Sequence, residues 1–137
     1  MKTIISFITL MLISLSSAAQ NDRWILFSDT PDRQVFIDSH SVSFLNQGMV
    51  DVWIKAHYKN EQYNYRKNFY AEKRRVRINC GTRAYSTLQL NLYTENDVFI
   101  TEVMTDPKWY IAEPESLMEK AMTVCELRSV VLNKKPS

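Results

Sequence analysis

The sequence predicts an α+β fold: an antiparallel sheet of about six strands with one C-terminal helix packed on one face. Between residues 24 and 103, apolar and polar residues alternate in segment after segment, which is typical of half-buried strands. A 3.6-residue apolar period appears only near the C-terminus, where it indicates a helix. Strands that come first and a single helix that comes last are typical of α+β domains.

The expected strands follow from the alternation. The clearest one spans residues 49–58, where apolar residues at even positions alternate with Trp53 and polar residues at odd positions. The polar run 59–62 is the expected hairpin loop, and the next segment is long enough that we expect a bend near residues 71–72. In chain order, we expect strands at residues 24–27, 34–38, 42–44, 49–58, 63–79, 84–93 and 98–103, with a short addition at 109–111.

A helix is expected at residues 117–127. Ser116 and Glu119 form a capping box, in which the serine caps the helix and the glutamate occupies the third helical position. The apolar stripe of this helix repeats at i, i+3, i+4 and i+7. It consists of Met118, Ala121, Met122 and Cys125.

The N-terminus has the pattern of a secretory signal peptide at residues 1–19. Lys2 precedes an apolar run at 4–15, and small residues follow. The run is too short for a transmembrane helix, which needs about 20 apolar residues. We expect cleavage after Ala19, with cleavage after Ala18 as the alternative.

Export changes the interpretation of the two cysteines, because disulfides persist in oxidising compartments. Cys80 lies on the apolar face of an expected strand and Cys125 on the helix stripe, so we expect a disulfide that ties the helix to the sheet. The exported part, residues 20–137, is expected to be a single domain with its core at about 24–127. Its sequence has no cysteine after the cleavage site for a lipid anchor.

Composition excludes several classes of function. Gly48 and Gly81 are the only glycines, so neither glycine-rich nucleotide-binding motif is present. The adjacent residues 38–40, Asp-Ser-His, do not form a catalytic triad, whose members converge from separate elements. His40 and His57 are isolated, and we expect no metal, no cofactor and no enzymatic activity. Without Lys2, 16 basic residues face 15 acidic ones, a net charge of +1 that does not favour nucleic acid.

A succession of short segments resembles a known family. The segments are W-I-L at 24–26, V-F-I-D at 35–38, V-D-V-W-I-K at 50–55, V-R-I-N-C at 76–80, R-A-Y-S at 83–86, and W-Y-I-A-E-P-E-S at 109–116, followed by Val124 and Cys125. In this order the chain resembles the surface-adhesin protein E family over residues 24–127. The resemblance implies an antiparallel sheet with a disulfide-held C-terminal helix.

The resemblance also implies a function. It implies a bacterial surface protein that binds host extracellular proteins such as vitronectin, laminin and plasminogen, and members are sometimes described as binding haem and dimerising. The named adhesin is an outer-membrane lipoprotein. Because this sequence has no lipid-anchor cysteine, we expect an exported protein that is periplasmic, or secreted to the cell surface.

The candidate binding residues are basic and lie on one long segment. They are Arg66, Lys67, Lys73, Arg74, Arg75 and Arg77, and the same segment, residues 63–77, also carries four aromatic residues, Tyr63, Tyr65, Phe69 and Tyr70, and the single acid Glu72. Such a strand suits host extracellular-matrix proteins or another polyanionic surface through charge attraction and stacking. The alternative is a solvated edge strand whose charges deter pairing with another sheet.

Trp53 is the basis of a second hypothesis about the function. The alternation places it on the face opposite to Val52 and Ile54, where it can anchor a partner or a second subunit, or be covered by a loop. Two functions therefore remain. The first is an exported binding protein that uses the basic strand, and the second is a structural or accessory protein of the bacterial envelope that packs through Trp53.

Overall fold

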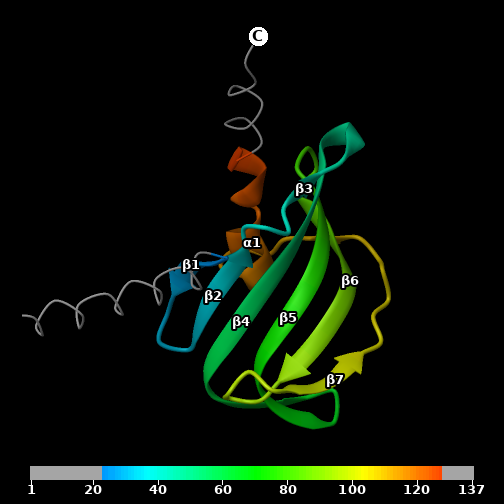
Figure 1. Ribbon diagram of the computed structural model, residues 1–137. Helices are drawn as coiled ribbons and strands as arrows, with labels where there is room; N and C mark the ends of the chain where they lie inside the picture. Colours follow the sequence, from blue (N-terminus) through cyan, green and yellow to red (C-terminus); the bar gives the residue numbers. More distant parts are fainter. Residues whose placement is uncertain (1–22, 128–137) are drawn as a thin grey trace, which may run out of the picture.

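The structure is a computed structural model that describes residues 23–127, so the expected signal peptide lies outside the described residues. Within this range, eight strands form one antiparallel sheet, and a short helix packs on it (Figure 1). The elements are β1 Trp24–Asp29, β2 Arg33–Asp38, β3 Ser43–Phe44, the 3-10 helix η1 Asn46–Gly48, β4 Met49–Asn64, β5 Lys67–Asn79, β6 Ala84–Tyr93, β7 Phe99–Val103, β8 Tyr110–Ile111 and α1 Leu117–Ala121.

Six strands form the continuous path β1-β2-β4-β5-β6-β7, which agrees with the expected number. The two others are two-residue additions, in which β3 pairs with β4 and β8 pairs with β6. β4 is longer than its neighbour β2, and β6 is longer than its neighbour β7. The two short strands pair with the parts of β4 and β6 that β2 and β7 leave unpaired. The described chain is therefore mostly β, with less helix than expected.

The helix begins where the sequence predicts and ends sooner. Ser116 Oγ accepts a hydrogen bond from the Glu119 backbone N–H at 3.2 Å, which caps α1. α1 ends at Ala121, two turn residues follow, and residues 124–127 form a further helical turn. Thr123 Oγ1 donates to the Lys120 carbonyl at 2.7 Å and competes for that acceptor, so the expected continuous helix is interrupted.

The core lies between the helix and one face of the sheet. Its sheet side consists of Val50, Val52, Ile54 and Ala56 of β4, Val35 and Ile37 of β2, and Val76 and Ile78 of β5, and its helix side includes Leu117, Met118 and Ala121, all buried. At its edge, Cys80 and Cys125 form the predicted disulfide, with the two Cα atoms 5.6 Å apart. The prediction of a helix tied to one face is therefore confirmed.

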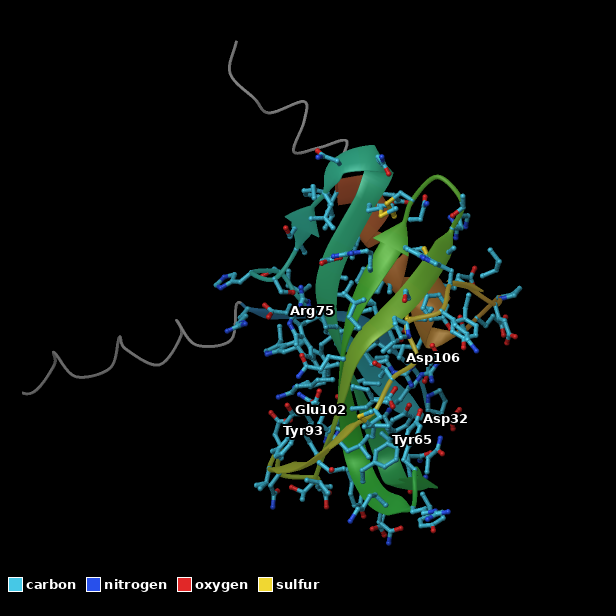
Figure 2. The ribbon with its side chains drawn as sticks, turned by 90° about the vertical axis from the view of Figure 1, so that its right-hand side faces the viewer. Asp32, Tyr65, Arg75, Tyr93, Glu102 and Asp106 are labelled. Atoms are coloured by element: carbon cyan, nitrogen blue, oxygen red, sulfur yellow. A yellow bond between two sulfur atoms is a disulfide. The ribbon has the colours of Figure 1, made fainter. Side chains whose placement is uncertain are left out.

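The opposite face of the sheet carries the alternate side chains. Because successive residues of a strand point to opposite faces, those beside the core residues point away from the helix. We call this surface, which carries Trp53, Lys55, Lys73, Arg75 and Arg77, the helix-free face. Figure 2 shows Arg75 on this side of the sheet and the helix on the other.

The hairpin between β4 and β5 differs from the prediction. The run 59–62 lies inside β4, where the pairing with β5 shifts between His57 and Gln62, so it forms a bulge rather than the turn. The turn consists of Tyr65 and Arg66, whose φ angles of 53° and 60° match a two-residue hairpin. The expected bend near residues 71–72 is also displaced, since β5 shifts register against β6 between Arg75 and Val76.

Replacing both cysteines with serine should lower the free energy of unfolding by about 4 kcal/mol, because the bridge joins positions 45 residues apart and restricts the unfolded chain. Urea unfolding, followed by tryptophan fluorescence, measures the loss. Reductant should destabilise the wild type by a similar amount and leave the double variant unchanged. A loss below about 1 kcal/mol would contradict the structural role of the bridge.

Candidate functional site

The structure divides the candidate basic residues between two faces and one turn. Lys73, Arg75 and Arg77 lie on the helix-free face, whereas Arg74 is opposite the core residue Ile54 and therefore faces the helix side. The sequence predicted one continuous basic strand. In the structure, three of its cations share one face of the sheet, and Arg74 lies on the other face.

The other two candidates lie at the hairpin. Arg66 is a turn residue and Lys67 begins β5, and both are exposed. Lys67 and Lys73 are six residues apart on one strand, which corresponds to about 20 Å. The hairpin cations therefore form a separate charged tip rather than part of the cluster on the helix-free face.

Arg75 and Arg77 share one carboxylate. Arg77 binds Asp51 through two hydrogen bonds, Nε to Oδ1 at 2.7 Å and Nη2 to Oδ2 at 2.9 Å. Arg75 Nη2 lies 3.5 Å from Asp51 Oδ2. Because one acid faces two guanidinium groups, this part of the face retains a positive charge.

Two lysines on the same face lie against aromatic rings. Lys55 Nζ is 5.3 Å from the centroid of the Trp24 ring and 4.8 Å from that of Phe36. Lys73 Nζ is 5.7 Å from the Trp24 centroid and 4.1 Å from that of Tyr93. These distances lie within the range of cation–π attraction.

The acidic residues near these lysines carry too little negative charge to neutralise the cations of the helix-free face. Lys73 pairs with Asp97 at 3.1 Å, while Lys55 makes no ion pair with any residue between 23 and 127. Glu102 of β7 lies opposite Asn91 at the sheet edge, on the side where Figure 2 shows Arg75 and Tyr93. On the helix-free face, Lys55, Lys73, Arg75 and Arg77 therefore exceed the neighbouring acids Asp51, Asp97 and Glu102 by one charge.

Arg74 has a structural partner on the helix side. Its Nε donates to Glu72 Oε1 at 3.0 Å, and the hydroxyl of Tyr58 donates to the same oxygen at 3.3 Å. The Glu72 side chain is 3% exposed. Burial, together with the Glu72 carboxylate, raises the pKa of Tyr58 to about 12. Arg74 therefore neutralises a buried acid.

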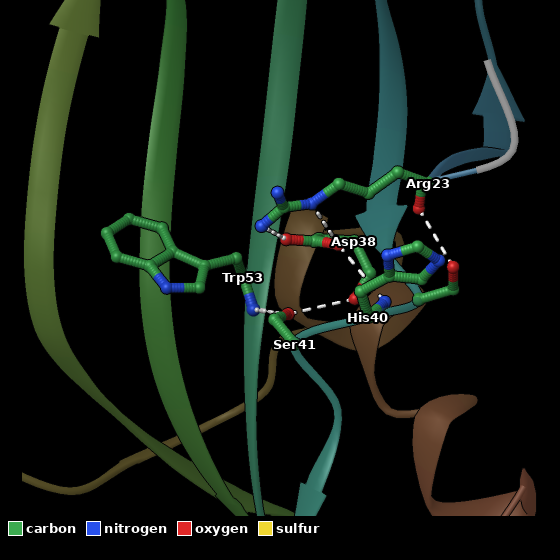
Figure 3. Close-up of polar contacts among 6 residues, drawn as sticks. Arg23, Asp38, His40, Ser41 and Trp53 are labelled. Atoms are coloured by element: carbon green, nitrogen blue, oxygen red, sulfur yellow. Dashed lines mark hydrogen bonds and ion pairs between the residues drawn. The ribbon is translucent and has the colours of Figure 1, made fainter. Parts of the chain in front are cut away.

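Trp53 is half-buried, and its backbone is held by a side chain. β2 pairs with β4 from Ile54 onward and β3 pairs with it up to Asp51, so Trp53 lies in the gap between these two neighbours. The Trp53 N–H donates to Ser41 Oγ at 2.8 Å, which satisfies the donor at this gap. Figure 3 shows this contact, with the indole directed away from Ser41.

An ion pair fixes the turn that carries Ser41. Arg23 donates two hydrogen bonds to the Asp38 carboxylate, at 2.9 and 2.7 Å, and Ser41 Oγ donates to the Asp38 carbonyl at 2.8 Å (Figure 3). Burial alone would raise the pKa of Asp38, but hydrogen bonds from Arg23 and the His40 backbone hold it below its ordinary value. The carboxylate thus stays charged and orders the turn behind Trp53.

A polar groove of about 580 Å³ opens on the helix side of the sheet. Its walls come from the β1–β2 turn, the bulged part of β4 and the start of the helical region, and they include Arg33, Tyr58 and Lys120. Acids line it as well, with Asp32 and Glu115 balancing the two cations. The groove therefore lacks the positive surplus of the helix-free face.

Histidines do not gather with other ligands in the described part of the chain, where no three His, Cys, Asp or Glu side chains are close enough to hold a metal ion. His57 Nε2 lies 3.3 Å from the Glu95 carbonyl oxygen. His40 contributes its backbone N–H to Asp38 at 3.1 Å.

Sequence reasoning missed Lys55, Trp24 and Phe36 as members of the basic face. The alternation in β4 places Lys55 beside Trp53 on this face, so this signal was present in the sequence. Phe36 likewise alternates with the buried Val35 and Ile37. Trp24 had no comparable signal, because its contact with Lys73 crosses β2 and β4 and depends on the strand order.

Comparisons with known proteins agree on the fold. A sequence profile of the family Surface-adhesin protein E matches residues 24–126. Crystal form II of Haemophilus influenzae protein E is 14% identical with a TM-score of 0.57, covering 78% of this chain and 89% of that one. Protein E from non-typeable Haemophilus influenzae is 15% identical with a TM-score of 0.58, covering 80% and 79%. No curated protein matches the chain.

The division of the arginines between faces predicts different losses of stability. Arg74→Ser leaves the buried Glu72 carboxylate without its cation and should lower the free energy of unfolding by about 3 kcal/mol. Arg75→Ser removes a half-exposed partner of Asp51 and should cost about 0.5 kcal/mol. Urea unfolding of both variants measures the difference, and equal losses would contradict the role of Arg74 as the cation that neutralises the buried Glu72.

Proposed function

This chain belongs to the surface-adhesin protein E family, and from that premise we propose that it is an exported, non-enzymatic binding protein whose helix-free face contacts anionic ligands. The single observation that carries the proposal is the gathering of four cations and several aromatic rings on the face that the helix does not cover. The ligands are host extracellular-matrix proteins or another polyanionic surface, which positive charge attracts over a distance.

Two features support export. The first is the signal-peptide pattern of residues 1–19, and the second is the disulfide, a bond that persists in oxidising compartments. Among the helices of residues 23–127, none has the length and apolar character needed to cross a membrane. The protein then works in the periplasm or at the cell surface.

The helix-free face supports this role better than the polar groove on the helix side. In the groove, basic and acidic residues balance, whereas the helix-free face keeps a surplus of one positive charge. Its rings add flat apolar surface beside the charges, which suits ligands that combine acidic groups with rings or aliphatic chains. Attraction of this kind weakens as salt rises.

Removing two of the charges should weaken binding to a polyanion. We expect Arg75→Gln combined with Arg77→Gln to weaken binding to immobilised heparin about tenfold at low salt, because the helix-free face loses two positive charges, each worth about 0.7 kcal/mol of attraction. Glutamine keeps a hydrogen-bond donor near Asp51, and urea unfolding of the double variant checks that the fold is preserved. Surface plasmon resonance measures the affinity, with vitronectin as a second immobilised ligand.

The control is a double variant that loses two positive charges on the helix side of the sheet. Lys120 lies in α1, and Lys108 pairs with Asp106, which Figure 2 shows on the helix side. Lys108→Gln with Lys120→Gln should leave heparin binding within about twofold of the wild type, since neither lysine lies on the helix-free face. Equal weakening by both pairs would mean that only net charge matters, and no weakening by either would refute the proposal.

An envelope structural role is the alternative, because Trp53 offers a half-buried indole on the same face. Light scattering of the same samples decides between the two. A homodimer that Trp53→Ala converts to a monomer, in a protein that does not bind heparin or vitronectin, would favour the structural role.

A further inference from the structure

Two lysines on the helix-free face directly oppose each other. Lys55 of β4 and Lys73 of β5 are register partners, so their Cβ atoms lie about 5 Å apart on the same side of the sheet. Like charges in this position repel each other and destabilise the sheet. An anion between the two ammonium groups would remove this repulsion.

Aromatic rings hold both lysines in place without neutralising them. Trp24 lies within 5.7 Å of both ammonium groups, and Phe36 and Tyr93 each contact one of them. Aromatic rings attract cations through their quadrupole but carry no net charge.

The two lysines differ in their acidic neighbours. Asp97 pairs with Lys73, while Lys55 has no ion pair within residues 23–127. Burial has the largest effect and lowers the pKa of Lys55, the nearby Asp97 carboxylate raises it, and the opposing Lys73 lowers it by less. One positive charge of the pair is therefore left without an acid.

We propose that Lys55 and Lys73 form a subsite for the sulfate ester of a sulfated glycan, with Trp24 beside them as a platform for the sugar ring. The inference rests on the proposed function and narrows its anionic ligands to one chemical class. The sulfate oxygens accept hydrogen bonds from both ammonium groups, and the charge of the sulfate cancels the repulsion between them.

The chemistry of the donors favours a sulfate ester over the carboxylates of an acidic peptide. Planar carboxylates match the two-pronged guanidinium of arginine, and on this face Arg77 already holds the Asp51 carboxylate in that manner. Ammonium groups are compact point charges with three rotatable donors each, so two of them can surround a tetrahedral anion. The aromatic rings supply flat apolar surface, against which the apolar face of a sugar ring packs.

The test uses a sulfated heparin disaccharide as the probe, with the wild type and the variants Lys55→Met and Lys73→Met. Each variant should bind the disaccharide at least tenfold more weakly by titration calorimetry. The matched control is Lys59→Met, which removes an exposed lysine of the same strand that pairs with Asp29, and its affinity should stay within twofold. The melting temperature and the circular dichroism spectrum of each variant, compared with the wild type, check that misfolding does not explain the loss.

Three further ligands test which chemical group the subsite recognises. The desulfated disaccharide and a tetraglutamate peptide should each bind at least tenfold more weakly than the sulfated disaccharide, and inorganic sulfate should bind more weakly because it lacks the ring.

NMR titration of the lysine side chains should show that the pKa of Lys55 rises when the disaccharide binds, because a nearby anion favours the ammonium form. A merely structural lysine would show no such rise.

Wild-type affinity in Lys55→Met, or tighter binding of the peptide than of the disaccharide, would overturn the subsite. If that occurs while Arg75→Gln with Arg77→Gln still weakens heparin binding, the subsite is wrong and the proposed function stands. If none of these substitutions weakens heparin binding, both fail.

Discussion

The bond between Cys80 and Cys125 holds the helical region on one face of the sheet, and the rest of the architecture depends on that placement. Cys80 directly follows β5, and the helix side chains near Cys125 complete the core with the even-numbered residues of β4. Because strand residues alternate between faces, the choice of a covered face also determines which side chains stay on the other one. The helix-free face is therefore the one that the crosslinked helical region and the apolar core leave uncovered.

Ion pairing then decides which of the many basic residues remain available. Arg74 is matched by Glu72 on the helix side, and Arg77 is held by Asp51 in a two-pronged contact. Lys55 has no such partner in the described chain and lies among aromatic rings instead. A count of charges along the sequence treats all of these basic residues alike. The structure distinguishes the cations that pair with acids of the protein from those that are available to a ligand.

Much of the fold could be predicted from the sequence, because alternation, the capping box at Ser116 and the spacing of the cysteines each report local geometry. The hairpin turn could not, since Tyr65 and Arg66 adopt left-handed angles without a glycine or asparagine to signal them. The site was predictable only in part. Alternation locates Lys73, Arg75 and Arg77, but it cannot show that Trp24 of β1 reaches across two strands.

The helix-free face is the binding surface that we propose for this protein. NMR of the ¹⁵N-labelled protein, titrated with a heparin oligosaccharide, tests it most directly, because each backbone amide reports contacts in its own neighbourhood. We expect the largest chemical-shift changes at the backbone amides of Lys55, Lys73 and Arg75, with little change in α1. Changes concentrated around the groove of Arg33, Tyr58 and Lys120 would place the ligand on the helix side and contradict it.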